Sequence, residues 1–273
     1  MSSAPAAPHD ASPERSAAAA FVDHVLAVAD AEVRKLRHDP LELLTRAVQP
    51  TLWLAVFGQV IGHLRGVPTG ALSYLDFMAP GILAQSVLFI AIFYGIAAIW
   101  ERDLGILHKY LVSPASRTAL ILGKALSAGV RALSQAVIVY ILALLMHIDA
   151  SFHPAAILGV LVLIILGSAL FSTFSLVIAC LVKTRERFMG IGQVLTMPLF
   201  FASNAIYPLS LMPAWLRAIS TLNPLTYQVD ALRALMVRGG ASSFGLGVDF
   251  GVLLAACGLM VAFAARLYPR MIT

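Results

Sequence analysis

Six long apolar runs constrain the fold of this chain more than any other sequence feature. A helix needs about 20 residues to cross a hydrocarbon core about 30 Å thick, and in lipid its backbone polar groups must be satisfied within the segment. The runs therefore predict an all-α integral membrane protein with six transmembrane helices. The expected spans are residues 44–62, 77–99, 125–147, 155–182, 190–207 and 250–268.

Two of these runs, the first and the fifth, are short or interrupted. Gln49-Pro50 lies within the first run, and Pro198 lies within the fifth. A proline leaves a backbone carbonyl without its usual donor, but neighbouring helices can satisfy that carbonyl inside a membrane. We therefore expect both runs to cross the bilayer when they are packed among the other helices.

The composition agrees with a membrane protein. Hydrophobic residues form 60% of the 273 residues and charged residues 12%, whereas a soluble domain is about 25% charged. No basic stripe interleaved with aromatic residues accompanies the net charge of +5, so we expect no nucleic-acid partner. Cys180 and Cys257 lie in apolar runs, which favours small buried side chains over a metal site.

Lysine and arginine gather in alternate connections between the runs. Arg102, Lys109 and Lys124 lie between the second and third runs, and Lys183 and Arg185 lie between the fourth and fifth. Further basic residues precede the first run and follow the sixth. The positive-inside rule therefore places these connections and both termini in the cytoplasm.

The N-terminal part precedes the first apolar run. Residues 1–20 are rich in Ala, Pro and Ser and lack the basic start and apolar core of a signal peptide, so we expect a disordered tail. Residues 21–38 have apolar positions near helical spacing, which predicts an amphipathic helix in the membrane interface, or one that packs on a partner or on the rest of the chain. Residues 21–273 are expected to form a single transmembrane domain.

Motifs for common catalytic chemistry do not occur in the sequence. Gly123-Lys124 lacks the upstream glycine of a P-loop and is followed by Ala125, so we do not expect the chain to bind ATP in that manner. HExxH and GxSxG are also missing. The prediction is a protein without a catalytic residue, a metal site or a cofactor of its own.

Charged residues are rare within the runs. Asp76, Asp149, Asp230 and Asp249 are expected at the membrane edges or in outer connections. Proton-coupled secondary transporters usually need an intramembrane acidic or histidine relay, so this arrangement argues against one. Arg131 is expected within the third run, where it either snorkels to the interface or faces an anionic substrate.

Residues 101–124 form a charged segment between two apolar runs. Its apolar positions recur at helical spacing and predict an amphipathic helix at the cytoplasmic surface, followed by a second short helix that starts at Ser113-Pro114. A projecting hairpin of this kind suits the docking of a soluble partner. The apolar positions are Trp100, Leu104, Leu107 and Leu111.

This segment resembles the corresponding part of ABC-2 type transporter permeases. Members commonly carry an acidic residue and an arginine after the second span, then a glycine, a Y-L-x-S-P stretch and a GK pair that enters the third span. A second stretch, "NPLTYQVDALR" from Asn223 to Arg233, is similar to the drug- and nodulation-factor-exporter branch, and the resemblance covers roughly residues 40 to 270. The residues that match the first motif are Glu101, Arg102, Gly105, Tyr110, Leu111, Ser113, Pro114, Gly123 and Lys124.

The resemblance implies a permease subunit of an ATP-driven exporter in a bacterial-type plasma (inner) membrane. Such permeases pair with a second copy or a paralogue, and two separate ATPase subunits beneath them hold ATP and Mg²⁺. The helix at 21–38 would be the family's connecting helix, and that at 101–112 the coupling helix that contacts the ATPase. The implied coupling residues are Glu101, Arg102, Leu104, Gly105, Leu107, His108, Lys109 and Leu111.

Residues 208–240 are patterned for two short helices before the last run. Pro213 suits the first position of one helix, and a second helix is expected over 224–237, where Asp230 and Arg233 can pair. We interpret them as a re-entrant pair that caps the outer side, with an ordinary outer loop as the alternative. The residues assigned to this outer gate are Pro208, Pro213, Trp215, Asn223, Pro224, Tyr227, Asp230 and Arg233.

The apolar runs favour a hydrophobic or amphipathic substrate such as a drug, a lipid or a glycolipid. A polysaccharide is the alternative, because aromatic residues can line glycan channels; a channel, a secondary transporter and a membrane-embedded enzyme are less favoured. Packing between helices is the more frequent role of such aromatic and polar residues. The residues that could line a pathway are Gln85, Phe89, Phe93, Arg131, Gln135, Phe200, Phe201 and Asn204.

Overall fold

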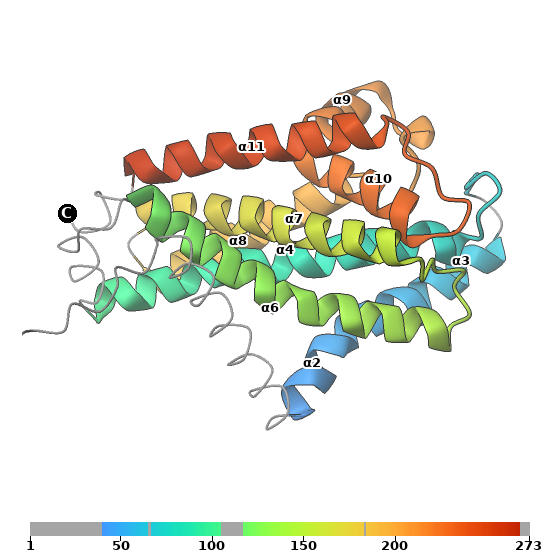
Figure 1. Cartoon of the computed structure of the whole chain (residues 1–273), viewed down its shortest axis with the longest axis horizontal. Coiled ribbons are helices and arrows are strands. Elements are labelled where there is room, and N and C mark those ends of the chain that lie inside the picture. Colours follow the sequence, from blue (N-terminus) through green and yellow to red (C-terminus); the bar gives the residue numbers. More distant parts are fainter. Residues whose placement is uncertain (1–39, 65–66, 105–116, 183, 268–273) are drawn as a thin grey trace, which may run out of the picture.

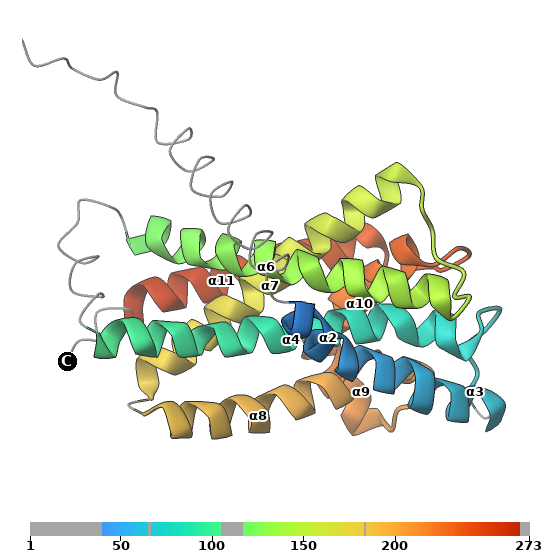
Figure 2. The same ribbon diagram turned by 90° about the horizontal axis from the view of Figure 1, so that it is seen from below.

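The computed structural model describes residues 40–64, 67–104, 117–182 and 184–267, and this part of the chain is helical, without a strand. The long helices lie side by side along one axis (Figures 1 and 2), and the short helices α9 and α10 gather toward the end opposite the C-terminus. The expected tail, the amphipathic helix at 21–38 and most of the expected coupling helix lie outside the described residues.

Among the described residues, four helices are long and apolar enough to cross a membrane. They are α4 (Tyr74–Asp103), α6 (Arg117–Leu145), α7 (Pro154–Leu181) and α11 (Leu246–Leu267). The qualifying part of α4 is Tyr74–Phe93 and that of α6 is Ile121–Leu145. These helices confirm the all-α class and correspond to the second, third, fourth and sixth expected spans.

The first and fifth runs form helices that do not reach the same length and hydropathy within the described residues. The first run is a continuous helix made of α2 (Pro40–Thr51), a π-helical stretch η1 (Leu52–Gly58) and α3 (Gln59–Leu64). The fifth run is α8 (Arg185–Phe201), which has 17 residues and ends before the expected limit at residue 207. The six-span count therefore stays a prediction.

Helix α8 ends at Phe201 because local polar groups take over its last carbonyls. The Ser203 hydroxyl and the Ser203 N–H both donate to the Phe200 carbonyl, at 2.7 and 3.2 Å. A short 3-10 turn, η2 (Leu209–Leu211), and the helices α9 (Ala214–Leu222) and α10 (Pro224–Met236) follow. The chain thus turns away from the membrane axis earlier than the apolar run alone suggests.

Helix α7 is the centre of the bundle. It packs against α4, α6 and α11, the three other long helices. Aliphatic and aromatic side chains of α4, α7 and α10 form the larger apolar cluster, whose fully buried members include Met78, Leu163 and Val229. A second cluster around Phe188 and Ile121 joins the other ends of the helices.

The proline in the first helix has a compensating contact. Pro50 has no N–H to donate to the carbonyl of Arg46, four residues earlier, as the helical ladder requires. Gln135 on α6 donates its Nε2 to that carbonyl at 3.3 Å, and the Arg46 Nη1 donates to the Ser134 hydroxyl at 3.0 Å. The first helix is therefore tied to α6 by polar contacts, as expected for polar groups between packed helices.

The start of α4 lies close against the connection between α8 and α9. A Cβ at Gly81 would lie 2.5 Å from the Ala205 carbonyl oxygen and 2.7 Å from the Ala205 Cα. The Tyr74 hydroxyl donates to the Ile206 carbonyl at 3.0 Å. Only a residue without a side chain permits this approach, which fixes the α8–α9 connection on α4.

Candidate functional site

Two short helices, α9 and α10, form the centre of the candidate site. The helix pair was expected, with small differences: Pro213 precedes the first residue of α9 instead of occupying it, and α10 ends at Met236. Asn223 separates the helices and caps α10, since its Oδ1 accepts the Leu225 N–H at 3.0 Å. Pro224 occupies the first turn of α10, where its missing N–H costs nothing.

Asn223 also fixes the helix pair to the end of α8. Its Nδ2 donates to the carbonyls of Leu199, at 2.7 Å, and Ala202, at 3.0 Å. The Tyr227 hydroxyl donates to the Thr221 carbonyl at 2.7 Å. One amide side chain thus joins three elements, which explains why an asparagine suits this turn.

Three charged residues lie buried beside these helices. The exposed fractions of Asp230, Arg233 and Asp249 are 0%, 5% and 0%. Asp230 and Asp249, which were expected at the membrane edges or in outer connections, are therefore both buried within the protein. Asp230 lies in the middle of α10 and Asp249 in the first turn of α11, and residues of the α8–α9 and α10–α11 connections contact this cluster.

The Asp230 carboxylate accepts hydrogen bonds from residues of the α8–α9 and α10–α11 connections. Its Oδ2 accepts the N–H groups of Ser243, at 2.6 Å, and Phe244, at 3.1 Å, and the Ser242 hydroxyl at 3.0 Å. Its Oδ1 accepts the Ser243 hydroxyl at 3.1 Å and the Asn204 Nδ2 at 3.3 Å. These contacts join the α8–α9 and α10–α11 connections to α10 through one carboxylate.

Arg233 supplies the positive charge of this cluster. Its Nη1 lies 3.8 Å from the Asp230 Oδ1, so the expected pairing of these two residues is present. Its Nε donates to the Phe77 carbonyl at 3.2 Å and its Nη2 to the Asn204 carbonyl at 2.7 Å. The guanidinium also lies 3.8 Å from the centre of the Phe77 ring, a favourable cation–π arrangement.

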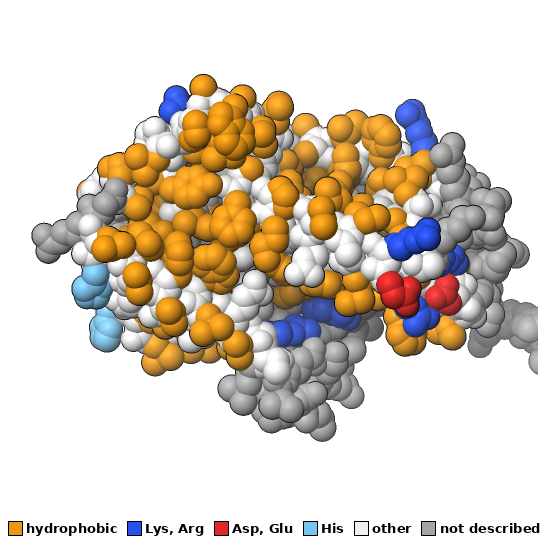
Figure 3. Space-filling model, turned by 180° about the vertical axis from the view of Figure 1, so that it is seen from behind, with side chains coloured by type: hydrophobic (Ala, Val, Ile, Leu, Met, Phe, Trp, Pro, Cys, Tyr) orange, Lys and Arg blue, Asp and Glu red, His pale blue; other side chains and the backbone are white. Residues whose placement is uncertain are grey.

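An apolar groove lies between α8 and α9. Its volume is about 640 Å³, and its wall includes Trp215 and Leu222, which are 66% and 85% exposed. Figure 3 shows that hydrophobic side chains cover this side of the molecule broadly, whereas the visible acidic side chains lie near one end. The groove lining comprises Leu195, Pro198, Leu199, Phe201, Ala202, Tyr207, Trp215, Leu216, Ile219, Leu222, Asn223 and Pro224.

A second groove runs along the first helix, with a volume of about 530 Å³. Its exposed aliphatic residues recur every fourth position and include Val48, Leu52, Val56 and Val60. Trp53 lies beside it and makes edge contacts with Phe57 and Phe200, at centroid distances of 5.1 and 5.5 Å.

The residues that could line a pathway are not gathered at one place. Phe201 lines the groove between α8 and α9, and Phe93 is exposed and stacks on the half-buried Phe89 at 6.3 Å. Phe200, Gln135 and Asn204 are buried and contact neighbouring helices or loops. Gln85 is buried without a hydrogen-bond partner among the described residues, and Arg131 is half-buried.

The end of α4 carries a separate charged cluster. The Arg185 Nη2 lies 2.9 Å from the Asp103 Oδ2, and its guanidinium lies 3.8 Å from the centre of the Trp100 ring. Arg102 donates to Asp103 and, at 3.3 Å, to the Val182 carbonyl. The end of α4 is therefore joined to the connection between α7 and α8.

The electrostatics of this cluster are governed by its arginines. Desolvation acts to raise the pKa of the Asp103 carboxyl, but hydrogen bonds and positive charges from Arg102 and Arg185 outweigh it and hold that pKa below its usual value. Leu104 is exposed. Gly105, Leu107, His108, Lys109 and Leu111 lie outside the described residues, as does the side chain of Glu101.

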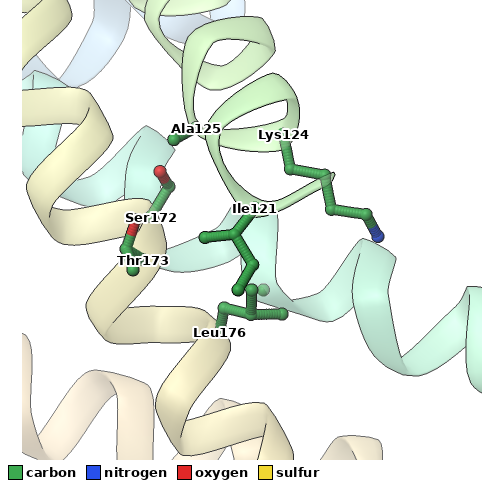
Figure 4. Close-up of a pocket in the computed structure, with 7 residues that line it drawn as sticks. Ile121, Lys124, Ala125, Ser172, Thr173 and Leu176 are labelled. Carbon is green, nitrogen blue, oxygen red and sulfur yellow. The ribbon is translucent and has the colours of Figure 1, made fainter. Parts of the chain in front are cut away.

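A small cavity between α4, α6 and α7 is shown in Figure 4. Its volume is about 10 Å³, which is close to the minimum for a single water molecule. Ser172 and Thr173 line it, and both hydroxyls donate to the Ala169 carbonyl. Lys124 extends away from those hydroxyls. This cavity is too small for a substrate.

Sequence reasoning missed the role of the connection between α10 and α11. Ser242, Ser243 and Phe244 surround Asp230, and Asp249 follows at the start of α11. The available signal was the pair of serines directly after Gly239-Gly240, since hydroxyl groups in a turn can satisfy a nearby carboxylate.

Comparison with known proteins gives a consistent set of similarities. A family model described as ABC-2 type transporter matches residues 23–237. A transport permease named ycf38 from Cyanophora paradoxa is 31% identical over 211 residues, which cover 74% of this chain and 70% of the relative.

Two bacterial permeases are similar over more of the chain. The daunorubicin resistance ABC transporter permease protein DrrB1 of Streptomyces coeruleorubidus is 27% identical over 259 residues, or 93% of this chain and 89% of the relative. The inner membrane transport permease YadH of Escherichia coli strain K12 is 25% identical over 233 residues, or 83% and 84% of the two chains.

Proposed function

Since this chain belongs to the ABC-2 type transporter family, we propose that it is the membrane-spanning subunit of an ATP-driven exporter. The observation that carries the proposal is the family match over residues 23–237, which includes three of the four helices able to span a membrane. Permeases of this family work with an ABC ATPase. This chain would form the transmembrane path, and ATP and Mg²⁺ would bind to the partner.

In this proposal the first helix and α8 complete a set of six spans. Residues 40–64 form 25 continuous helical residues, which at about 1.5 Å per residue extend about 37 Å and exceed the hydrocarbon thickness. Helix α8 is shorter, but the connection that follows it is covered by α4 and α10. An irregular backbone at membrane depth is tolerated when protein covers it.

The charged cluster at the end of α4 supports a cytoplasmic coupling region. Asp103, Arg185 and Trp100 join the end of α4 to the start of α8, at the beginning of the expected coupling segment 101–112, whose residues up to Asp103 form the end of α4. A movement of that segment, driven by an ATPase, would therefore displace α4 and α8 together. We propose that Glu101 to Leu111 contact the ATPase and that the two termini share this side.

The groove between α8 and α9 supports a hydrophobic or amphipathic substrate. Its walls are almost entirely apolar, and its volume of about 640 Å³ lies within the usual range for small-molecule sites. A relative named for daunorubicin resistance supports outward movement of a drug-like compound. The groove would shelter the apolar part of such a substrate beside the outer helix pair.

A polysaccharide is the second candidate substrate. Phe201, Tyr207 and Trp215 supply aromatic surface around the same groove, and aromatic rings can stack on sugar faces. The scarcity of polar groups along the groove favours the apolar substrate, because a glycan would also need hydrogen-bond partners.

Filling the groove tests the proposed pathway. Ile219 lines the groove and is partly exposed, so Ile219→Trp should fold and should reduce ATP-dependent uptake of an apolar fluorescent dye into inside-out vesicles. The vesicles would contain this chain and its cognate ATPase. Leu254→Trp, on the exposed side of α11, is the matched control. Equal uptake by both variants would contradict the groove as the route.

A further inference from the structure

The Ser242 hydroxyl lies between two buried carboxylates. Its Oγ is 3.0 Å from the Asp230 Oδ2 and 2.7 Å from the Asp249 Oδ2. The same oxygen accepts the Gly245 N–H at 2.7 Å. Both aspartates are fully buried, so bulk water does not separate these groups.

The number of protons in this arrangement can be counted. A serine hydroxyl has one hydrogen to donate and two lone pairs with which to accept. Ser242 can therefore donate to only one of the two carboxylates, and one lone pair is already occupied by the Gly245 N–H. If both carboxylates were ionised, the second short contact would bring two oxygens together without a hydrogen.

The two aspartates differ in how well their negative charge is supported. Asp230 accepts from Ser243, Phe244 and Asn204 in addition to Ser242, and it lies beside Arg233. Asp249 has no further donor among the described residues, and its Oδ1 is buried without a partner. The negative charge therefore belongs on Asp230.

Charge balance leads to the same assignment. Arg233 neutralises Asp230, so an ionised Asp249 would leave one unbalanced charge in the buried cluster. Helix α7, which packs on α11, carries no Asp, Glu, Lys, Arg or His within its bounds. The start of an α-helix favours a negative side chain, but this effect is smaller than the cost of burying an unpaired carboxylate.

Two cations of α6, the remaining long helix beside α11, are Arg117 and Lys124, and they lie at the end of α6 farthest from Asp249. Ile121, next to Lys124 and near Arg117, belongs to the same apolar cluster as Ala264 of α11. Ala264 is 15 residues after Asp249, or about 22 Å along the helix. Arg131 lies two to three turns after Ile121, at the middle of α6, and is therefore closer to the level of Asp249 than Lys124 is.

We propose that the Asp249 carboxyl holds a proton in the folded protein at neutral pH and donates it to Ser242, which in turn donates to Asp230. The hydrogen and both lone pairs of the Ser242 hydroxyl are then used: the hydroxyl accepts from Asp249 and Gly245 and donates to Asp230. The cluster is neutral overall, with one negative and one positive charge. The proton closes the connection over residues 239–245 onto α10 and α11.

The proposal does not depend on the transported substrate and gives this outer connection a sensitivity to pH. Loss of the proton would place two ionised carboxylates on either side of one hydroxyl, in surroundings that screen them poorly. The connection would then open away from the helix pair, because Ser242 can satisfy only one of them.

Infrared difference spectroscopy on the purified full-length protein, in an ester-free detergent at pH 7, tests the proton directly. The unmodified protein should show a carboxylic-acid C=O band that shifts in D₂O and is missing from Asp249→Asn. Asp149→Asn, which removes an exposed carboxylate, should keep the band, and Ser242→Ala should shift its frequency because the acceptor is lost. No band difference between the unmodified protein and Asp249→Asn would overturn the proposal.

Thermal unfolding of the same variants supplies a second readout. Asp249→Asn should unfold at a higher temperature than the unmodified protein at pH 7, because folding of the unmodified protein must place a proton on a carboxyl that is ionised in the unfolded chain above about pH 4. This difference should shrink as the pH is lowered toward about 4, where the carboxyl is protonated in both states. Asp230→Asn should unfold at a clearly lower temperature. Stabilisation by added Na⁺ or Ca²⁺, without the infrared band, would show that a cation bridges the carboxylates and would also overturn the proposal.

Discussion

Arg233 shows at the residue scale how this fold holds a buried charge. Its guanidinium contacts an aromatic ring, two backbone carbonyls and one carboxylate, which belong to α4, the α8–α9 connection and α10. Each donor that faces the interior therefore has a partner or a ring surface. The residue joins three parts of the chain that are distant in sequence.

Replacing Arg233 should have a large effect on stability. Arg233→Ala leaves Asp230 buried without its counter-charge, and breaking such a pair costs about 3–5 kcal/mol. Arg238→Ala removes an exposed partner of Asp149, at 3.5 Å, and should cost no more than about 1 kcal/mol. Thermal unfolding in detergent measures both, and similar losses in the two variants would contradict the role assigned to the buried residue.

The sequence could predict part of this cluster and not the rest. Asp230 and Arg233 are three residues apart within a helical pattern, so their pairing follows from helix geometry. The partnership of Ser242 with Asp230 and Asp249 depends on the path of a connection after Gly239-Gly240, which local patterns do not determine. Burial of Asp249 was missed for the same reason.

At the element scale, α4 and the α8–α9 connection are held at a distance that only glycine allows. Gly81→Ala would place a Cβ within 2.5 Å of a backbone oxygen, and backbone cannot move aside as a flexible side chain can. We expect a loss of about 1–3 kcal/mol, which is typical of overpacking.

A glycine in open surroundings provides the control for that change. A Cβ at Gly258, on α11, would meet no described atom within 4 Å, so Gly258→Ala should be neutral or stabilise the helix by up to about 1 kcal/mol. Both variants can be compared by thermal unfolding. Equal stability of Gly81→Ala and the unmodified protein would show that the two segments are not packed this closely.

The ion pair between Asp103, at the end of α4, and Arg185, at the start of α8, leads to a functional prediction; we call it the α4–α8 bridge. Arg185→Ala removes the partner of Asp103 and the cation over Trp100, so substrate stimulation of the partner ATPase should fall while basal hydrolysis persists. Arg187→Ala, on the exposed side of the same helix, is the control. Unchanged stimulation in Arg185→Ala would contradict a coupling role.

The pH dependence of the same bridge follows from the lowered pKa of Asp103. A carboxyl whose pKa is lower in the folded state stabilises that state above its unfolded pKa, and the stabilisation is lost as the pH falls through the folded value. The bridge should therefore persist between pH 6 and 8 and weaken only below the usual carboxyl range, about pH 4.

Considered as a whole molecule, the protein has two polar ends joined by an apolar bundle. Charged residues at the end of α4 begin the expected coupling segment, and the buried Asp230 cluster lies toward the opposite end. The sequence predicted the four long spans because long apolar runs have few alternatives. It did not predict where α8 ends, since Ser203 bonds to the Phe200 carbonyl through a specific local contact.

The most direct test of the proposed function is co-purification with an ATPase. The chain would be tagged, expressed together with its cognate ABC ATPase, and purified in detergent. We expect a stoichiometric complex with vanadate-sensitive ATP hydrolysis that apolar compounds stimulate. A folded chain that transports such a compound without any bound ATPase would contradict the account and would favour a channel or a secondary transporter.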